Sequence, residues 1–120
     1  MDKIIISDLK IFAYHGVNPS EKVNGQDFYL DITAFTDLSV PCQTDRLEDT
    51  VSYAKIIKTA LRVFTAQTYN LIEKAAQVTA EALLREYPKL TEVELTVKKP
   101  NAPINAEFLT VAVTINRKNA

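Results

Sequence analysis

The sequence predicts an α+β fold in which two helices cover one face of a four-stranded antiparallel sheet. Apolar and polar residues alternate in two segments near each end of the chain, which is typical of half-buried strands. Two segments between them carry apolar residues at intervals of three and four, as amphipathic helices do. The resulting order ββααββ favours one layer of helices packed on one sheet.

The first two strands are expected over residues 3–14 and 27–34, joined by a loop and therefore most simply an antiparallel pair. In the first strand one face is expected to hold Ile5, Leu9, Ile11 and Ala13, with Ser7 as a polar exception. In the second strand the apolar face is expected to hold Phe28, Leu30, Ile32 and Ala34.

Residues 38–50 are polar and interrupted by Pro41, which indicates an irregular connection. The first helix follows, with Ser52 as its N-cap; its apolar residues are Ile57, Ala60, Leu61 and Phe64. The second helix is expected to begin near Asn70 and to stop before Pro88. Its apolar side is expected to hold Ile72, Ala75, Ala76, Thr79, Ala82 and Leu83.

The third strand is expected to end at Lys99, because Pro100 cannot continue the pairing. Its odd positions are Val93, Leu95, Val97 and then Lys99. After a turn-rich segment, the last strand is expected to hold Leu109, Val111, Val113 and Ile115. No charge precedes Arg117 on this strand to protect an exposed edge, so we expect a symmetric oligomer, closed into a ring or barrel.

Composition restricts the class of protein. With 120 residues, 47% of them apolar, the chain is expected to form a single domain over 1–120. A net charge of −1 without a basic stripe argues against nucleic acid or an anionic membrane as partner. The short apolar start with its acidic residue is unlike a signal peptide, so we expect a cytoplasmic protein.

The sequence offers little to a metal or a nucleotide cofactor. His15 is the only histidine and Cys42 the only cysteine, whereas catalytic zinc sites use about three protein ligands. With only Gly16 and Gly25, neither a P-loop nor a dinucleotide fingerprint can be built. We therefore expect no metal and no cofactor, and we interpret His15 as a turn residue and Cys42 as inert.

Four side chains are candidates for chemistry. Lys99 lies on the apolar face of its strand, where burial can lower a lysine pKa toward neutrality. Alternatively, its aliphatic stem packs along the edge of the core and its amine reaches water. Glu21 lies in a loop and could be a solvated carboxylate, and Tyr53 in a first helical turn could simply pack. Glu73 could form a capping box with Asn70 or bind a ligand at the helix start.

Four motifs together resemble the dihydroneopterin aldolase family over nearly the whole chain. They occur in the family's order and spacing: Tyr14-His15-Gly16-Val17 with Glu21 and Gly25-Gln26; Asp49-Thr50-Val51-Ser52-Tyr53; Leu71-Ile72-Glu73; and Val97-Lys98-Lys99-Pro100-Asn101-Ala102-Pro103-Ile104. The resemblance implies the ββααββ tunnelling fold, with four subunits forming a ring, two rings forming an octamer, and active sites between subunits.

The resemblance also implies a reaction and a set of site residues. The reaction is cleavage of 7,8-dihydroneopterin into 6-hydroxymethyl-7,8-dihydropterin and glycolaldehyde in folate biosynthesis, without a metal or a Schiff base. Lys99 matches the family's catalytic lysine, Tyr53 a tyrosine offered by the neighbouring subunit, and Glu21 a loop glutamate. Glu73 matches the pterin anchor, and backbone groups of Val51 and Ile72 complete the pterin contacts.

Two other functions stay open. An epimerase acting on dihydroneopterin or its triphosphate would use the same retro-aldol step followed by re-addition. An epimerase specific for the triphosphate needs a basic cluster to bind the phosphates, and only Lys22 and Lys98 are candidates for it. The second alternative is a non-catalytic module that binds a pterin or purine.

Overall fold

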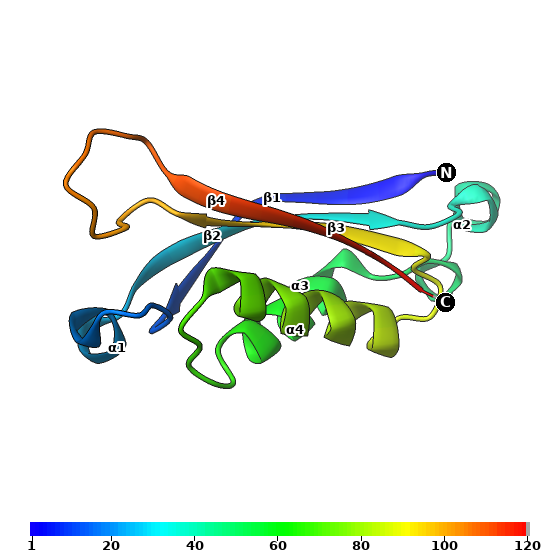
Figure 1. The fold of residues 1–120 in the computed structure, drawn as a ribbon. Helices are drawn as coiled ribbons and strands as arrows, with labels where there is room; N and C mark the ends of the chain where they lie inside the picture. The colour runs from blue at the N-terminus through cyan, green and yellow to red at the C-terminus, as the bar shows by residue number, and fades with distance from the viewer. Residues whose placement is uncertain (120) are drawn as a thin grey trace.

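The computed structural model describes residues 1–119 and contains one antiparallel sheet in the order β1-β2-β3-β4. The strands are β1 (Lys3–Ala13), β2 (Gln26–Phe35), β3 (Glu92–Lys99) and β4 (Val111–Lys118). Helices α3 (Tyr53–Phe64) and α4 (Ile72–Glu86) pack together on one face of the sheet (Figure 1). The predicted α+β architecture and its ββααββ order of main elements are confirmed.

Three short elements were not predicted: α1 (Pro19–Asn24), α2 (Ser39–Thr44) and a 3-10 turn, η1 (Leu47–Asp49). The segment 38–50 is therefore not wholly irregular. Six residues make fewer than two helical turns, too few to show a helical period in the sequence. For α1, the local signal was Asn18 before Pro19, since asparagine favours the N-cap and proline the first helical position.

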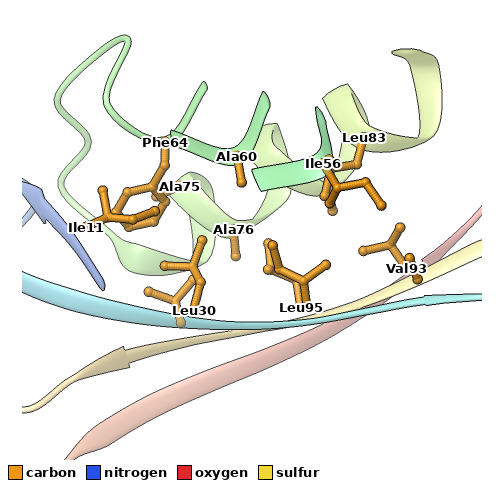
Figure 2. Close-up of a cluster of buried hydrophobic side chains, with 14 of the residues drawn as sticks. Ile11, Leu30, Ile56, Ala60, Phe64, Ala75, Ala76, Leu83, Val93 and Leu95 are labelled. Atoms are coloured by element: carbon orange, nitrogen blue, oxygen red, sulfur yellow. The ribbon is translucent and has the colours of Figure 1, made fainter. Parts of the chain in front are cut away.

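The hydrophobic core lies between the sheet and the two long helices (Figure 2). All four apolar residues expected on β2 are fully buried, and so are Val93, Leu95 and Val97 of β3. The predicted inner face of α4 is confirmed, because Ile72, Ala75, Ala76, Thr79, Ala82 and Leu83 are all buried. Since strand side chains alternate, Lys99 continues the core-facing row of β3 at the end of the core.

Both long helices differ in detail from the prediction. The buried side of α3 is centred on Ile56, Ala60 and Phe64, so Ile57 is half-buried and Leu61 is exposed. Ser52 is the N-cap of α3, but its side chain makes no capping hydrogen bond.

The expected capping box at the start of α4 is absent. This helix begins at Ile72 with Leu71 as its N-cap, one residue later than Asn70 would require. Glu73 is therefore the second helical residue instead of the third, and it cannot close a capping box on Asn70.

The expected single apolar face of β1 is wrong for its first half. The pairing register with β2 shifts between Ile6 and Leu9, and Asp8 has a left-handed backbone with φ of 52°. The resulting β-bulge reverses the alternation, because one extra residue moves the following side chains to the other face. Ile4 and Ile6 consequently pack on the core, whereas Ile5 is 58% exposed.

The last strand buries less than predicted. Leu109 precedes β4 and is 95% exposed, and Val111 is also exposed; only Val113 and Ile115 pack against the core. The physical reason is position, since β4 is an edge strand whose preceding loop extends beyond the helices (Figure 1). Among residues 1–119, no helix is long and apolar enough to cross a membrane.

Candidate active site

A buried ion pair joins the end of β3 to α1. The Lys99 Nζ lies 2.6 Å from the Glu21 Oε2, and the two side chains are 13% and 6% exposed. The amine of Lys99 therefore ends on a carboxylate and does not extend into bulk water. The alternative that Glu21 is a solvated surface carboxylate is wrong, because α1 folds it against the sheet end.

Two further donors complete the hydrogen bonding of the Glu21 carboxylate. The Gln26 Nε2 donates to Oε2 at 2.8 Å, and the backbone N–H of Asn18 donates to Oε1 at 3.2 Å. Burial alone would raise the pKa of Glu21, but the bonds from Lys99, Gln26 and Asn18 and the charge of Lys99 lower it below its usual 4.5. Glu21 is thus a carboxylate at neutral pH.

Gly16 leaves the space that this carboxylate occupies. A Cβ at this position would lie 2.3 Å from the Glu21 Cδ and 2.4 Å from Oε1, and the backbone φ of 151° is one that L side chains rarely adopt. Neither Gly16 nor Gln26 was among the predicted site residues. Both belong to the first of the four family motifs, together with Glu21, but their contact with its carboxylate is seen only in the folded loop.

His15, interpreted from the sequence as a turn residue, lies in the loop after β1 and also has a packing role there. Its ring is buried, with 1% exposure, and packs against Phe28, Phe64 and Tyr69. Burial lowers the pKa of His15 below its ordinary 6.5; the hydrogen bond to the Phe64 carbonyl opposes this effect, and the charges of Lys99 and Lys22 add to it. His15 is therefore neutral at neutral pH.

The other predicted site residues are not joined to this ion pair within the chain. Tyr53 is 67% exposed at the start of α3, and Glu73 is exposed in the first turn of α4. Across residues 1–119, neither side chain takes part in a hydrogen bond or ion pair. The side chains of Val51 and Ile72 are buried in the core, which leaves only their backbone groups for a ligand.

Two separate surface hollows lie beside predicted site residues, one at Glu21 and one at Val51. One of about 360 Å³ opens beside Glu21, between α1 and the loop after β3; its lining includes Gln26, Asn101 and Pro103. The Gln26 Oε1 is buried there and accepts no hydrogen bond from the described part of the chain. A separate hollow of about 530 Å³ lies at Val51 and Ser52, with Lys55 and Tyr87 on its walls.

No group of three or more His, Cys, Asp or Glu side chains within residues 1–119 is arranged to hold a metal ion. The thiol of Cys42 is free and exposed on α2. The chemistry that the site itself offers is proton transfer, because an amine in contact with a carboxylate that lines a hollow can bind and release protons.

The Lys99–Glu21 pair makes a prediction about titration. Replacing Lys99 by methionine removes a hydrogen bond and a positive charge, so the Glu21 pKa is expected to rise by about 1 to 3. Carboxyl ¹³C NMR over a pH series measures this directly. Because the folded-state pKa is depressed, the pair stabilises the wild-type fold above about pH 4.5, and this contribution is lost as the pH falls through the lowered value.

The matched control is Lys98→Met. Lys98 is the preceding residue but lies on the opposite face of β3, where its amine pairs with Asp8 at 2.8 Å and Asp31 at 2.9 Å. The Glu21 pKa is expected to stay at its wild-type value in this variant. An equal rise in both variants, or none in Lys99→Met, would contradict the assigned pairing.

Comparisons with known proteins identify the family. The FolB dihydroneopterin aldolase model matches residues 4–116. The chain is 36% identical over 116 residues to a dihydroneopterin aldolase of Methylorubrum extorquens, covering 97% of this chain and 89% of that relative. It is 33% identical over 120 residues to the Bacillus subtilis dihydroneopterin aldolase, covering both chains completely.

A solved structure agrees with these sequence matches. The E. coli dihydroneopterin aldolase in complex with neopterin superposes with a TM-score of 0.89 at 29% identity, covering 98% of this chain and 99% of that one. The expected tunnelling-fold topology is thereby confirmed for the single chain. On the family model, the relatives and the fold together, the chain belongs to the dihydroneopterin aldolase family and is an aldolase.

Proposed function

We propose that this protein cleaves 7,8-dihydroneopterin into 6-hydroxymethyl-7,8-dihydropterin and glycolaldehyde by general acid–base catalysis. The observation that carries the proposal is the buried contact of 2.6 Å between Lys99 and Glu21, whose side chain lines a hollow. Family membership supplies the substrate class. The E. coli relative, whose structure contains neopterin, supports a pterin as the ligand.

The retro-aldol step needs two proton movements. A side-chain hydroxyl of the substrate loses its proton, the neighbouring carbon–carbon bond breaks, and glycolaldehyde leaves. The electron pair of that bond passes into the dihydropterin ring, and a proton is then delivered to the carbon left behind. Lys99 carries these protons, through water, while Glu21 orients its amine and Tyr53 assists delivery to the intermediate.

Glu73 serves as the anchor for the pterin ring. Its exposed carboxylate can accept two parallel hydrogen bonds from the ring N–H and the 2-amino group, a charge-assisted geometry that also fixes orientation. The first backbone N–H groups of α4 have no partners inside the helix, which leaves Ile72 free to add a contact. The backbone of Val51 completes the binding of the ring.

The distribution of these residues supports a site shared between subunits. Tyr53 and the hollow at Val51 lie apart from the ion pair in one chain, so a neighbouring copy supplies them. The sheet has two edge strands, β1 and β4, with backbone groups available for pairing. Exposed apolar residues border β4, namely Ile104, Phe108, Leu109 and Val111. A ring of four subunits, stacked in pairs as an octamer, covers these edges.

Epimerase activity toward dihydroneopterin accompanies the aldolase activity, since re-addition of glycolaldehyde to the same intermediate can give the opposite configuration at the hydroxyl-bearing carbon that derives from the aldehyde group. The triphosphate is the poorer substrate. Lys98 is held by Asp8 and Asp31 on the other face of the sheet, and the amine of Lys22 bonds to the Gly16 carbonyl. Neither lysine is therefore available to form a triphosphate-binding cluster.

Lys99→Ala is expected to lower kcat for glycolaldehyde release by about 10²- to 10⁴-fold, because it removes the proton carrier. A coupled glycolaldehyde assay with dihydroneopterin measures the loss, and Lys98→Ala is the matched control, expected to keep wild-type kcat. Full activity in Lys99→Ala would contradict the mechanism. A wild-type protein that binds pterin but never cleaves it would favour a non-catalytic binding module.

Glu73→Gln is expected to fold normally and to bind neopterin about 10- to 100-fold more weakly, because a carboxamide cannot accept both hydrogen bonds and carries no charge. Isothermal titration measures the dissociation constant. Glu81→Gln, an exposed position on the same helix, is the control and is expected to change nothing. Equal affinities of the wild type and Glu73→Gln would mean that Glu73 has no ligand role.

The shared site predicts complementation between two inactive variants. When Lys99→Ala and Tyr53→Ala chains assemble together, about a quarter of the interfaces join an intact Lys99 to an intact Tyr53. Co-expressed mixtures are therefore expected to recover activity that neither variant has alone, in particles of about eight subunits by sedimentation. A monomeric wild type, or mixtures as inactive as the separate variants, would place the whole site within one chain.

A further inference from the structure

The dipeptide His15-Gly16, in the loop after β1, makes three hydrogen bonds to the end of α3 and to the segment that leads from α3 to α4. The His15 Nε2 donates to the carbonyl of Phe64 at 2.7 Å, and the backbone N–H of Tyr69 donates to the His15 Nδ1 at 3.0 Å. The N–H of Gly16 donates to the carbonyl of Tyr69 at 3.0 Å. We call these three bonds the β1 clamp.

The partners of His15 fix its chemical state. A backbone carbonyl can only accept a hydrogen bond and a backbone N–H can only donate one, so both bonds form only in the neutral ring with its proton on Nε2. Aromatic rings close the surroundings, with centroids at 5.6 Å for Phe28, 4.7 Å for Phe64 and 5.5 Å for Tyr69. The ring therefore has one orientation and one tautomer.

The β1 clamp connects two parts of the proposed site, the Lys99–Glu21 pair and the start of α4. On one side Gly16 lies directly against the Glu21 carboxylate, which holds Lys99. On the other side Tyr69 lies only two residues before Leu71, the N-cap of α4, and Glu73 is in the first turn of this helix. Within residues 1–119, no hydrogen bond or ion pair joins α1 itself to the α3–α4 segment, so these bonds of His15 and Gly16 are the polar link between the two parts.

We propose that His15 and Gly16 are positioning residues, which hold the Lys99–Glu21 pair in a fixed relation to the first turn of α4 and to Glu73. The inference rests on the proposed function, which makes Glu73 the ring anchor and Lys99 the proton carrier. His15 acts only through these groups and does not touch the substrate.

The expected defect of a broken clamp follows from the geometry. With the ring still anchored by Glu73, binding persists, but the proton carrier no longer meets the substrate hydroxyl correctly. A misplacement of about 1 Å costs about 10²-fold in rate. Loss of the clamp therefore lowers kcat and leaves the affinity for neopterin almost unchanged.

Two substitutions of His15 separate positioning from simple packing. His15→Phe keeps the ring volume and loses both side-chain hydrogen bonds. His15→Asn loses ring volume but keeps an oxygen that can accept from the Tyr69 N–H. We expect kcat to fall about 10- to 100-fold in His15→Phe and less in His15→Asn, although His15→Asn has the lower Tm. A purely structural role predicts that kcat per folded subunit stays constant in both.

The matched control is Phe28→Leu, which removes a ring packed on His15 without removing a hydrogen bond. It is expected to lower Tm and to keep wild-type kcat per folded subunit. If His15→Phe does not fold, the same comparison is made between His15→Asn and Phe28→Leu. Equal kcat in these two, or wild-type kcat in a folded His15→Phe, would overturn the inference.

Assaying Lys99→Ala beside these variants distinguishes the two levels of the proposal. An inactive Lys99→Ala with a fully active His15→Phe contradicts the clamp alone. An active Lys99→Ala contradicts the proposed function, whatever the His15 variants do. A selective rise in the Kd for neopterin in His15→Phe, with unchanged kcat, would show that His15 acts on binding and would also overturn the clamp.

The pH dependence of stability gives an independent readout. Protonation of the His15 Nδ1 would replace the hydrogen bond from the Tyr69 N–H with a repulsive contact between two N–H groups. The positive charges of Lys99 on β3 and Lys22 on α1 also oppose this protonation. Since burial lowers the folded-state pKa, His15 stabilises the fold above about pH 6.5, and this contribution is lost as the pH falls through the lowered pKa. The Tm advantage of wild type over His15→Phe is expected to shrink between about pH 7.5 and about pH 5; a constant difference would contradict the neutral, bonded ring.

Discussion

The carboxylate of Glu21 connects the segment between β1 and β2 to the end of β3, 78 positions later in the chain. It contacts Lys99 at the end of β3, Gln26 at the start of β2 and the backbone of Gly16 after β1. A buried charge left without its partner costs about 3–5 kcal/mol, so each of these segments is held where it can contact the same carboxylate. The candidate active site is therefore an electrostatic arrangement at the end of a hydrophobic sheet.

Strict alternation made the inner strands predictable, because both their faces follow from a period of two and hydrophobic burial. It failed on β1, where the bulge at Asp8 depends on Asp31, a residue of the next strand whose Oδ1 accepts the Asp8 N–H at 2.8 Å. It overestimated burial on β4, since an edge strand has only one neighbour and its first residues leave the helix layer. Long-range partners, which local patterns do not encode, account for both differences.

The site residues divide in the same way. The core-facing position of Lys99 was predictable from its place in the row of Val93, Leu95 and Val97. The burial of Glu21 was not, because it depends on a six-residue helix and on a lysine 78 positions later in the chain. The burial of His15 could not be predicted from its neighbours in the sequence, because the aromatic rings around it come from β2, from the end of α3 and from the segment after it. Tyr53 and Glu73 are not joined to the Lys99–Glu21 pair within one chain, so only the family resemblance indicates a role for them in the same site.

The adjacent lysines of β3 have a consequence for strand register. Lys98 and Lys99 point to opposite faces of the sheet, and each meets its own carboxylates, Asp8 with Asp31 on one face and Glu21 on the other. A slip of one residue in either direction would leave only one lysine opposite an acidic group, with Val97 or Pro100 in the other place. It would also turn the whole apolar row of β3 toward water. Charge pairing and hydrophobic burial therefore favour the same alignment, and together they decide which of two chemically identical amines faces Glu21.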